Sequence, residues 1–348
     1  MRLLLPVLFF LLKIFTSYSQ NTARVEVITC GTNTSLRGMS IPSDEVIWVS
    51  GSNGTIGKSV DAGKTWQWII VLGLEKKDFR DIEAFDSSTA IAMAVDNPAI
   101  IVKTTDGGTT WKKVFERARE GMFLDAMDFK NEKEGICIGD PLPAGQTSQK
   151  QFYIIRTFDG GSTWKEIASQ QRITAQTGEA IFAASGTNIS FLNNPDFEYV
   201  FVTGGSVSNV HLIARLGKPN KVINIPIAQG KETKGTFSMV TDKQKRMYCI
   251  GGDYKSPGDN FSNYSYTTNE GVTWDSAKVR SPFGYRSCIR IINHKTLVAC
   301  GPTGVDFAAN GHKEWKKSSL AGFNVCMVSK GKQVFLAGEK GKIGRLTF

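Results

Sequence analysis

Three arginines stand at similar places in this chain of 348 residues, and their side chains suit the binding of an anion. Arg37, Arg80 and Arg286 each follow a large hydrophobic residue at the start of a strand-like run. A guanidinium group holds a carboxylate through two parallel, charge-assisted hydrogen bonds, so three of them on one rim would clamp an anionic group. The same arginines could instead form ion pairs with neighbouring carboxylates and only solvate the surface.

The elements that must position these arginines come from an internal repeat. The pattern Ser/Thr-x-Asp-x-Gly-x-Thr-Trp occupies residues 59–66, 104–111 and 157–164, and a fourth copy at 267–274 has Asn in place of Asp. A fifth copy, around Asn310-Gly311 and Trp315, is eroded. Each copy lies between two strand-like runs, which predicts a hairpin turn that recurs along the chain.

The residue types of the repeat explain a turn without any chemistry. The Asp can accept hydrogen bonds from backbone amides and from the Thr hydroxyl, the Gly adopts a conformation that is costly for other residues, and the Trp packs on the sheet. We therefore assign these residues a structural role: Asp61, Gly63, Trp66, Asp106, Gly108, Trp111, Asp159, Gly161, Trp164, Asn269, Gly271 and Trp274.

The spacing of the repeats predicts an all-β fold, a seven-bladed β-propeller. Successive Trp residues of the repeat are 45 and 53 residues apart, and a later gap of 110 residues fits two periods with one copy lost. The units are predicted to open near Leu36, Phe79, Phe123, Glu179, Thr236, Tyr285 and Phe323. The last unit has only three strands, so we expect residues 24–29 to supply its fourth and close the ring. Residues 20–348 then form a single domain.

Several of these segments resemble a known family. Phe79-Arg80-Asp81-Ile82, Asp106-Gly107-Gly108 and the run Gly338-Glu339-Lys340-Gly341-Lys342-Ile343 are similar to the repeat of Asp-box proteins, also called bacterial neuraminidase repeat proteins. Within that group the chain resembles the photosystem II assembly/stability factor family, over nearly all of residues 20–348. The resemblance implies a propeller that assists the assembly of a protein complex and is not a catalyst.

The propeller prediction places the arginines and several acidic residues on one face. The first strand of each blade lines the channel, and the loop into it shares a face with the loop between strands two and three. The two longest loops, 141–151 and 254–263, project from that face. We predict a binding site made of Arg37, Arg80, Arg286, Asp96, Asp140, Asp253 and Glu339.

An exo-sialidase, a type of glycoside hydrolase, is the enzymatic alternative. It would need an arginine triad, a Tyr nucleophile with a Glu partner, and an Asp acid/base. Arg37, Arg80 and Arg286 are candidates for the triad, with Tyr285 and Glu179 nearby. However, sialidases resemble one another in a Phe/Tyr-Arg-Ile-Pro start, and here the first unit begins Leu36-Arg37-Gly38-Met39. Because neighbours on a strand alternate faces, Tyr285 beside Arg286 is expected to point away from the channel. The sequence therefore favours a non-catalytic binding or assembly module.

Charge and composition narrow the partner and the compartment. The formal net charge of +10 favours a protein or glycan partner with acidic groups, and the scattered Lys and Arg do not indicate nucleic acid. Residues 1–19 have the layout of a signal peptide cleaved after Ser19, so we expect a secreted or periplasmic monomer. We find no other run long enough to span a membrane, and no motif for a metal or cofactor.

The six cysteines fit buried strand positions better than a set of disulfides. Cys137, Cys249 and Cys300 each lie near the end of an apolar run that leads into a Gly, where a small hydrophobic side chain is expected. Cys288 and Cys300 flank a short hairpin and could form one bridge across it.

Overall fold

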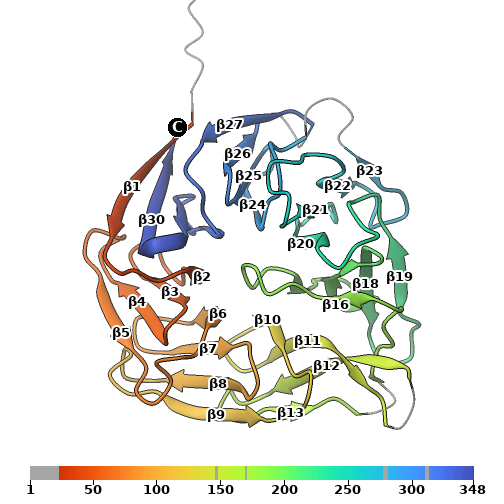
Figure 1. Ribbon diagram of the computed structural model, residues 1–348, viewed down its shortest axis with the longest axis horizontal. Coiled ribbons are helices and arrows are strands. Elements are labelled where there is room, and N and C mark those ends of the chain that lie inside the picture. The colour runs from red at the N-terminus through yellow and green to blue at the C-terminus, as the bar shows by residue number, and fades with distance from the viewer. Residues whose placement is uncertain (1–22, 146–147, 169–170, 277–280, 310–312) are drawn as a thin grey trace, which may run out of the picture.

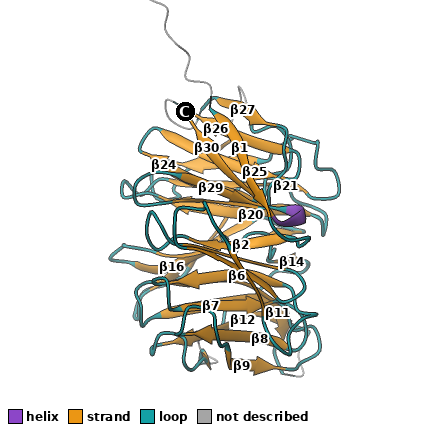
Figure 2. Cartoon of the chain, turned by 90° about the vertical axis from the view of Figure 1, so that its left-hand side faces the viewer, coloured by secondary structure: helices purple, strands orange, loops and turns teal. Residues whose placement is uncertain are grey.

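The ring of seven blades is confirmed. The computed structural model describes residues 23–145, 148–168, 171–276, 281–309 and 313–348. Within these residues, seven antiparallel sheets surround a central channel, and the shortest axis of the molecule passes through the ring (Figure 1, Figure 2). The predicted signal peptide and the eroded turn at Asn310-Gly311 lie outside the described residues. No described residue belongs to a helix that is long and apolar enough to cross a membrane.

The first three blades follow one another along the chain, each with its innermost strand first. They consist of β2 (Leu36–Ser40), β3 (Ile47–Gly51), β4 (Thr55–Ser59) and β5 (Gln67–Ile70); β6 (Phe79–Ala84), β7 (Ala90–Ala94), β8 (Ala99–Thr104) and β9 (Lys112–Arg117); and β10 (Leu124–Phe129), β11 (Gly135–Pro143), β12 (Lys150–Thr157) and β13 (Lys165–Glu166).

The next three blades keep this order. They consist of β15 (Ile189–Phe191), β16 (Phe197–Val202), β18 (Asn209–Ala214) and β19 (Lys221–Asn224); β20 (Lys234–Thr241), β21 (Met247–Asp253), β22 (Tyr264–Thr267) and β23 (Asp275–Ser276); and β24 (Cys288–Asn293), β25 (Thr296–Gly301), β26 (Gly304–Ala308) and β27 (Trp315–Ser319).

The fourth blade does not open at Glu179, and that prediction is wrong. Glu179 belongs to β14 (Glu179–Ala180), which pairs with β17 (Gly204–Gly205) and thereby extends the sheet of the fifth blade. The Glu179 side chain is buried, where Oε1 accepts hydrogen bonds from Thr203, Asn209 and His211 at 2.6, 2.9 and 2.8 Å. The innermost strand of the fourth blade is β15. The segment 182–188, between β14 and β15, belongs to neither sheet.

The N-terminal strand closes the ring as predicted. The seventh blade contains β28 (Val325–Val328), β29 (Val334–Ala337) and β30 (Lys342–Thr347), with the short 3-10 turn η2 (Glu339–Gly341) between the last two. Its fourth strand is β1 (Arg24–Cys30), which pairs with β30 from Arg24 opposite Thr347 to Cys30 opposite Lys342. The two ends of the chain thus hold each other, and the edge of β30 is covered.

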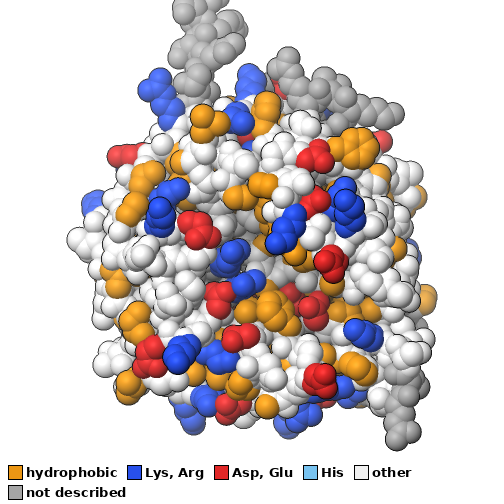
Figure 3. Space-filling model, in the orientation of Figure 1, with side chains coloured by type: hydrophobic (Ala, Val, Ile, Leu, Met, Phe, Trp, Pro, Cys, Tyr) orange, Lys and Arg blue, Asp and Glu red, His pale blue; other side chains and the backbone are white. Residues whose placement is uncertain are grey.

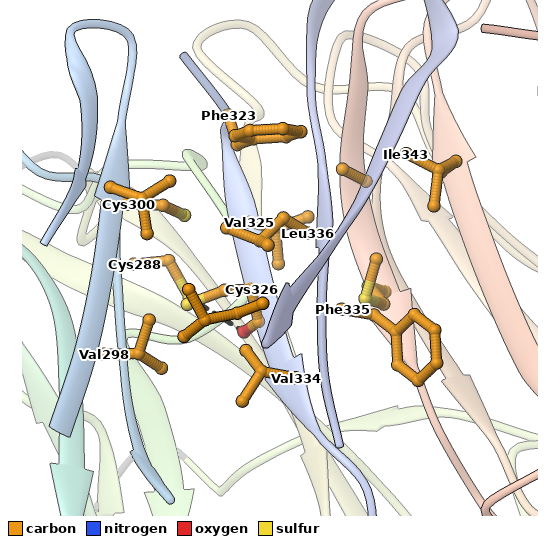
Figure 4. Packing of buried hydrophobic residues seen from close by; sticks show 14 of the residues in the cluster. Cys288, Val298, Cys300, Phe323, Val325, Cys326, Val334, Phe335, Leu336 and Ile343 are labelled. Atoms are coloured by element: carbon orange, nitrogen blue, oxygen red, sulfur yellow. Dashed lines mark hydrogen bonds between the residues drawn. The ribbon is translucent and has the colours of Figure 1, made fainter. Parts of the chain in front are cut away.

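The hydrophobic core lies between neighbouring blades. Figure 4 shows the cluster where the last two blades meet the first, with Cys288, Cys300 and Cys326 among aliphatic and aromatic side chains. The Cys288 thiol donates to the Cys326 carbonyl at 3.3 Å, and Cys288 lies opposite Cys300 in the sheet. All six cysteines are free, and every one except Cys30 is buried.

The repeated turns share one set of hydrogen bonds. In residues 104–111, Asp106 Oδ1 accepts from the Thr110 amide at 2.9 Å and Oδ2 from the Thr110 hydroxyl at 2.6 Å. Gly108, with φ of +88°, donates to the Thr104 hydroxyl at 3.0 Å. The hydrogen bond from the Thr110 hydroxyl, followed by that from its amide, lowers the pKa of Asp106 to about 2. Asp61, Asp159 and Asn269 accept the equivalent amide bonds at 2.9 Å.

Candidate functional site at the channel mouth

A β-bulge lies at the start of the innermost strand in four of the blades, the first, second, third and fifth. The register shifts between Leu36 and Gly38 in the first blade and between Phe79 and Asp81 in the second. The bulged residues are Arg37 and Arg80. Since a bulge places an extra residue opposite one partner and re-aims its side chain, these two arginines share the same position in adjacent blades.

Arg37 and Arg80 lie close enough to repel each other. Burial, and then the charge of Arg80, lower the pKa of Arg37. Arg80 is partly satisfied, because Nε donates to Asp78 Oδ2 at 2.7 Å and Nη1 to the Ala183 carbonyl at 3.3 Å. The guanidinium of Arg37 has only Glu339 Oε1 at 3.9 Å and makes no hydrogen bond within the part of the chain that the structure describes. Its donors therefore remain available.

Aromatic side chains border these arginines. Phe182 and Phe237 stack with 4.1 Å between ring centroids, and Tyr285 meets Phe237 edge-on at 4.7 Å. Tyr254, 42% exposed, packs edge-on against Phe182 and Phe237 at 6.3 and 6.2 Å. Burial raises the pKa of Tyr285, although the charges of Arg37 and Arg80 act on it in the opposite direction. The mouth thus combines two guanidinium groups with an aromatic wall.

The segment 182–188 lies across the channel at this mouth. Ser185 donates to the Ser287 carbonyl of the sixth blade at 2.7 Å, and Thr187 donates to Ser238 of the fifth blade at 2.6 Å. The carbonyl of Ala183 accepts from Arg80 of the second blade. A loop that precedes the fourth blade is therefore fixed to three others, and Figure 1 shows it in yellow-green at the centre of the ring.

Arg286 does not join the mouth, and that part of the predicted site is wrong. The Arg286 amide donates to the Gly251 carbonyl of the preceding blade, as Leu36 donates to Gly338. Arg286 therefore occupies the buried position of Leu36, and Ser287 occupies the bulge position of Arg37. The Arg286 side chain is completely buried and pairs with Asp306 at 2.7 Å.

The same register reverses the expected direction of Tyr285. If Arg286 faced the channel, alternation would turn Tyr285 away from it. Instead the Tyr285 ring packs edge-on against Phe237 of the aromatic wall, with 4.7 Å between ring centroids. The sequence does not reveal this register, because Tyr285-Arg286 and Phe79-Arg80 are both an aromatic residue followed by Arg.

The four predicted acidic residues divide into two groups. Glu339 accepts from Ser35 Oγ at 2.8 Å beside Arg37. Asp140 accepts from the Ile181 amide at 3.0 Å. The charges of Asp140 and Arg80 both act on the pKa of the buried Asp125, in opposite directions. In contrast, Asp96 pairs with Lys77 at 3.5 Å, and Asp253 accepts from the Lys255 amide at 2.9 Å. No contact in the described residues connects Asp96 or Asp253 with Arg37 or Arg80.

Sequence reasoning missed Asp78 and Asp125 as the acidic neighbours of Arg80. Asp125 stands at the bulge of the third blade, equivalent to Arg37, and burial, followed by the charge of Asp140, raises its pKa well above the ordinary value. Aligning the third unit on the first would have exposed Asp125 as the residue that replaces the arginine. Figure 3 looks onto this face and shows acidic and basic side chains around its centre.

The described residues contain no group of three His, Cys, Asp or Glu side chains arranged to hold a metal ion. The chemistry that the mouth offers is hydrogen bonding and charge: free guanidinium donors beside a rigid apolar wall can hold the carboxylate of a ligand whose neighbouring group is apolar.

Comparison with solved structures gives the same architecture. A structure of YCF48 bound to D1 peptide has 17% sequence identity, covers 94% of this chain and 97% of that chain, and gives a TM-score of 0.64. A structure of YCF48 from Cyanidioschyzon merolae has 15% identity, with 92% and 98% covered and a TM-score of 0.63. No family model and no curated protein matches the chain. The resemblance expected from the repeats is thereby confirmed for the fold: the chain has the seven-bladed propeller of YCF48.

Proposed function

We propose that the protein is a non-catalytic binding module that holds a carboxylate of a partner protein at the channel mouth. The observation that carries the proposal is the guanidinium of Arg37, which lies beside Arg80 and makes no hydrogen bond within the described residues. Two adjacent positive groups with free donors are stabilised by an anion between them. That a related fold, YCF48, has been solved with a peptide supports a protein partner over a small molecule.

The aromatic wall favours a peptide whose chain end or acidic residue adjoins an apolar side chain. Such a peptide would place its carboxylate on Arg37 and Arg80 and its apolar group against Phe182 and Tyr254. A glycan with acidic groups shares the carboxylate but offers less to the aromatic wall, and we keep it as the second candidate partner.

The geometry favours the binding module over the sialidase alternative. An arginine triad would need Arg286 at the mouth, and its side chain is buried with Asp306. A Tyr nucleophile needs a lowered pKa, whereas burial raises that of Tyr285. Glu179, its suggested partner, is bound to His211 and Thr203 instead.

The test uses a fluorescein-labelled panel of acidic peptides that end in a free carboxylate, and the same panel with amidated ends. We expect binding that weakens as salt rises, prefers the free carboxylate, and falls at least tenfold in Arg37→Ala/Arg80→Ala, about 1.4 kcal/mol. The matched control is Arg24→Ala/Arg345→Ala, which removes the same charge from the outer strands of the seventh blade.

Equal binding by the Arg37→Ala/Arg80→Ala variant, or equal binding of amidated peptides, would overturn the proposal. Sialyllactose serves as the glycan probe, and binding of it alone would move the partner class to glycans. Turnover of a fluorogenic sialoside that disappears in Arg37→Ala would establish the enzymatic alternative.

We also propose that the protein is exported and monomeric. The support is the layout of residues 1–19, with its apolar run and small residues before Gln20. Intact mass of the protein from its native host should give a chain that begins at Gln20, and sedimentation should give one chain per particle. A mass that includes residues 1–19 would contradict export by cleavage.

A further inference from the structure

The turn between β18 and β19 is a degenerate copy of the repeated turn. Leu212 pairs with Lys221 in the fourth blade, as Lys103 pairs with Lys112 in the second. Residues 213–220 therefore correspond one to one with residues 104–111, with no insertion. Gly217 keeps the backbone of Gly108, since their φ values are +86° and +88°. This is the copy that the spacing of the Trp residues indicates as lost.

Four substitutions remove the hydrogen bonds and the ring that stabilise the other turns. Ile213 stands in place of the Thr whose hydroxyl accepts from the Gly amide. Arg215 stands in place of the Asp, Pro219 in place of the Thr that donates to it, and Asn220 in place of the Trp. Arg215 Nε donates to the Asn194 carbonyl at 3.0 Å, and Asn220 Oδ1 accepts from the Ala214 amide at 2.9 Å. The turn is thus held from within its own blade and supplies no indole to the neighbouring one.

A groove of about 450 Å³ lies between this turn and the third blade. Its lining includes the apolar side chains of Ile167, Tyr199 and Ile213 together with Arg156 and the turn itself. A Cβ added at Gly108 would meet Ile69 and Trp48 of the preceding blade, but one added at Gly217 would meet nothing within 4 Å. The fourth blade's turn therefore stands away from the third blade and leaves the interface open.

Five of the other six interfaces between blades show which side chain fills this position. Trp66, Trp111, Trp164, Trp274 and Trp315 each belong to the hydrophobic cluster between their own blade and the preceding one. The cluster between the third and fourth blades contains Phe and Ile residues but no Trp. Among the described residues, the groove therefore corresponds to a position that a Trp occupies at five other interfaces and that no Trp occupies here.

Arg156 is a charged residue in the lining of the same groove. Its equivalents in the first two blades are Lys58 and Lys103, whose Nζ atoms donate to the turn carbonyls of Gly107 and Gly160 at 2.6 and 2.7 Å. Arg156 has no such carbonyl and instead pairs with Glu134 and Glu198, both at 2.7 Å. Its Nε is buried and has no hydrogen-bond partner among the described residues.

We propose that this groove binds a turn of a partner protein that inserts an indole side chain between the third and fourth blades and offers a backbone carbonyl to Arg156. The site is separate from the channel mouth and does not depend on the function proposed for it. The partner would complete the interface in the same way as the chain's own turns complete the others, with an aromatic ring on Tyr199 and Ile213.

The first test uses N-acetyl-tryptophanamide with protein labelled at the Ile δ1 methyl groups. We expect saturable chemical-shift changes at Ile167 and Ile213, and none with N-acetyl-alaninamide. The second probe is a fluorescein-labelled acetyl peptide with the sequence of residues 104–111, which we expect to bind at least tenfold more tightly than its Trp→Ala form. Absence of shifts at both methyl groups, or equal binding of the two peptides, would overturn the proposal.

Binding of the two probes to variants of the groove distinguishes a specific indole site from unspecific binding. Arg215→Asp/Pro219→Thr/Asn220→Trp restores the Asp, the second Thr and the Trp of the turn, so it should raise Tm and abolish binding of both probes. Leu320→Trp adds an exposed Trp elsewhere and should change neither. Arg156→Lys, which copies Lys58, should keep the peptide affinity, whereas Arg156→Met should lower it about tenfold.

A second blocking variant is needed in case the Trp of the triple variant does not pack into the groove. Ile167→Asp places a charge on the apolar lining and should also abolish binding of N-acetyl-tryptophanamide. If both blocking variants bind the probes like the parent, the site is not this groove. The Arg37→Ala/Arg80→Ala variant should bind both probes unchanged, so the two proposals can fail independently.

Discussion

Arg286 and Asp306 form an ion pair that is completely buried in the sixth blade, with 2.7 Å between Nη2 and Oδ2. The remaining donors of Arg286 reach Thr303 Oγ1 at 2.8 Å and the carbonyls of Tyr285 and Phe283 at 2.9 and 2.7 Å. Every N–H of the guanidinium is thus used inside the protein. Arg286 ties the loop before the sixth blade to that blade, and Arg37 and Arg80 are left as the arginines of the mouth.

Arg286→Ala should lower the free energy of unfolding by about 3–5 kcal/mol, because it leaves the Asp306 charge buried without its partner. Arg286→Met/Asp306→Leu removes both charges and should recover most of that loss. Urea unfolding measures both variants. A folded Arg286→Ala protein of parental stability that binds carboxylate peptides more weakly would instead return Arg286 to the binding site.

Removing β1 should open the ring. Deletion of residues 1–30 uncovers the edge of β30 and breaks the ladder from Arg24 to Cys30. Each backbone hydrogen bond contributes about 0.5–1.5 kcal/mol, so we expect a loss of several kcal/mol and association through the free edge. Urea unfolding and sedimentation velocity check this, with deletion of residues 1–22 as the control. Unchanged stability and a single-chain particle would show that β1 is dispensable.

The Asp106 turn should lose stability in acid. Its folded pKa of about 2 lies below the ordinary value of 3.8, so its contribution is complete above pH 4 and is lost as the pH falls towards 2. Asp106→Ala should lower Tm by a few degrees at pH 7. Asp106→Asn should retain most of the parental Tm without the acid sensitivity. In the fifth blade, Asn269 bonds the same two groups of Thr273: Oδ1 accepts from the amide, and Nδ2 donates to the hydroxyl. Tm measured from pH 2 to pH 7 distinguishes these outcomes.

Glu179→Ala should destabilise the region that holds the loop across the channel. Three buried donors, from Thr203, Asn209 and His211, lose their shared acceptor, at a cost of about 1–3 kcal/mol for each donor left unsatisfied. Hydrogen exchange should then show faster opening of residues 182–188 than of the second blade. Uniform protection in the variant would mean that Glu179 does not anchor this loop.

The stability that the Glu179 carboxylate contributes should decrease in acid. Burial alone would raise the pKa of Glu179, but the hydrogen bond and charge of His211 and the Thr203 hydroxyl outweigh it and lower the pKa. The stability that Glu179 supplies is therefore present above its ordinary pKa of 4.5 and is lost as the pH falls through the lower folded value. Urea unfolding of the parent and of Glu179→Gln across this pH range should converge in acid.

Much of the fold is visible in the sequence because its signals are local. The turn around Asp106 needs only residues 104–111, since its hydrogen bonds join atoms within that stretch. Regular spacing of such turns gives the number of blades. A last unit of three strands, together with a spare strand near the start of the chain, predicts the closure by β1. Periodic patterns and short-range hydrogen bonds do not depend on which distant segment packs nearby.

The site was decided by contacts between blades, which the sequence does not encode position by position. Tyr285-Arg286 and Phe79-Arg80 share the pattern of an aromatic residue before Arg. However, the hydrogen bond from the Arg286 amide to the Gly251 carbonyl places Arg286 one residue out of register with Arg80. A shift of one residue exchanges the side chain that faces the mouth with the one that faces the core. The sequence by itself therefore determined a ring of repeated hairpins, while tertiary packing determined that Arg37 and Arg80 face the mouth and that Arg286 is buried.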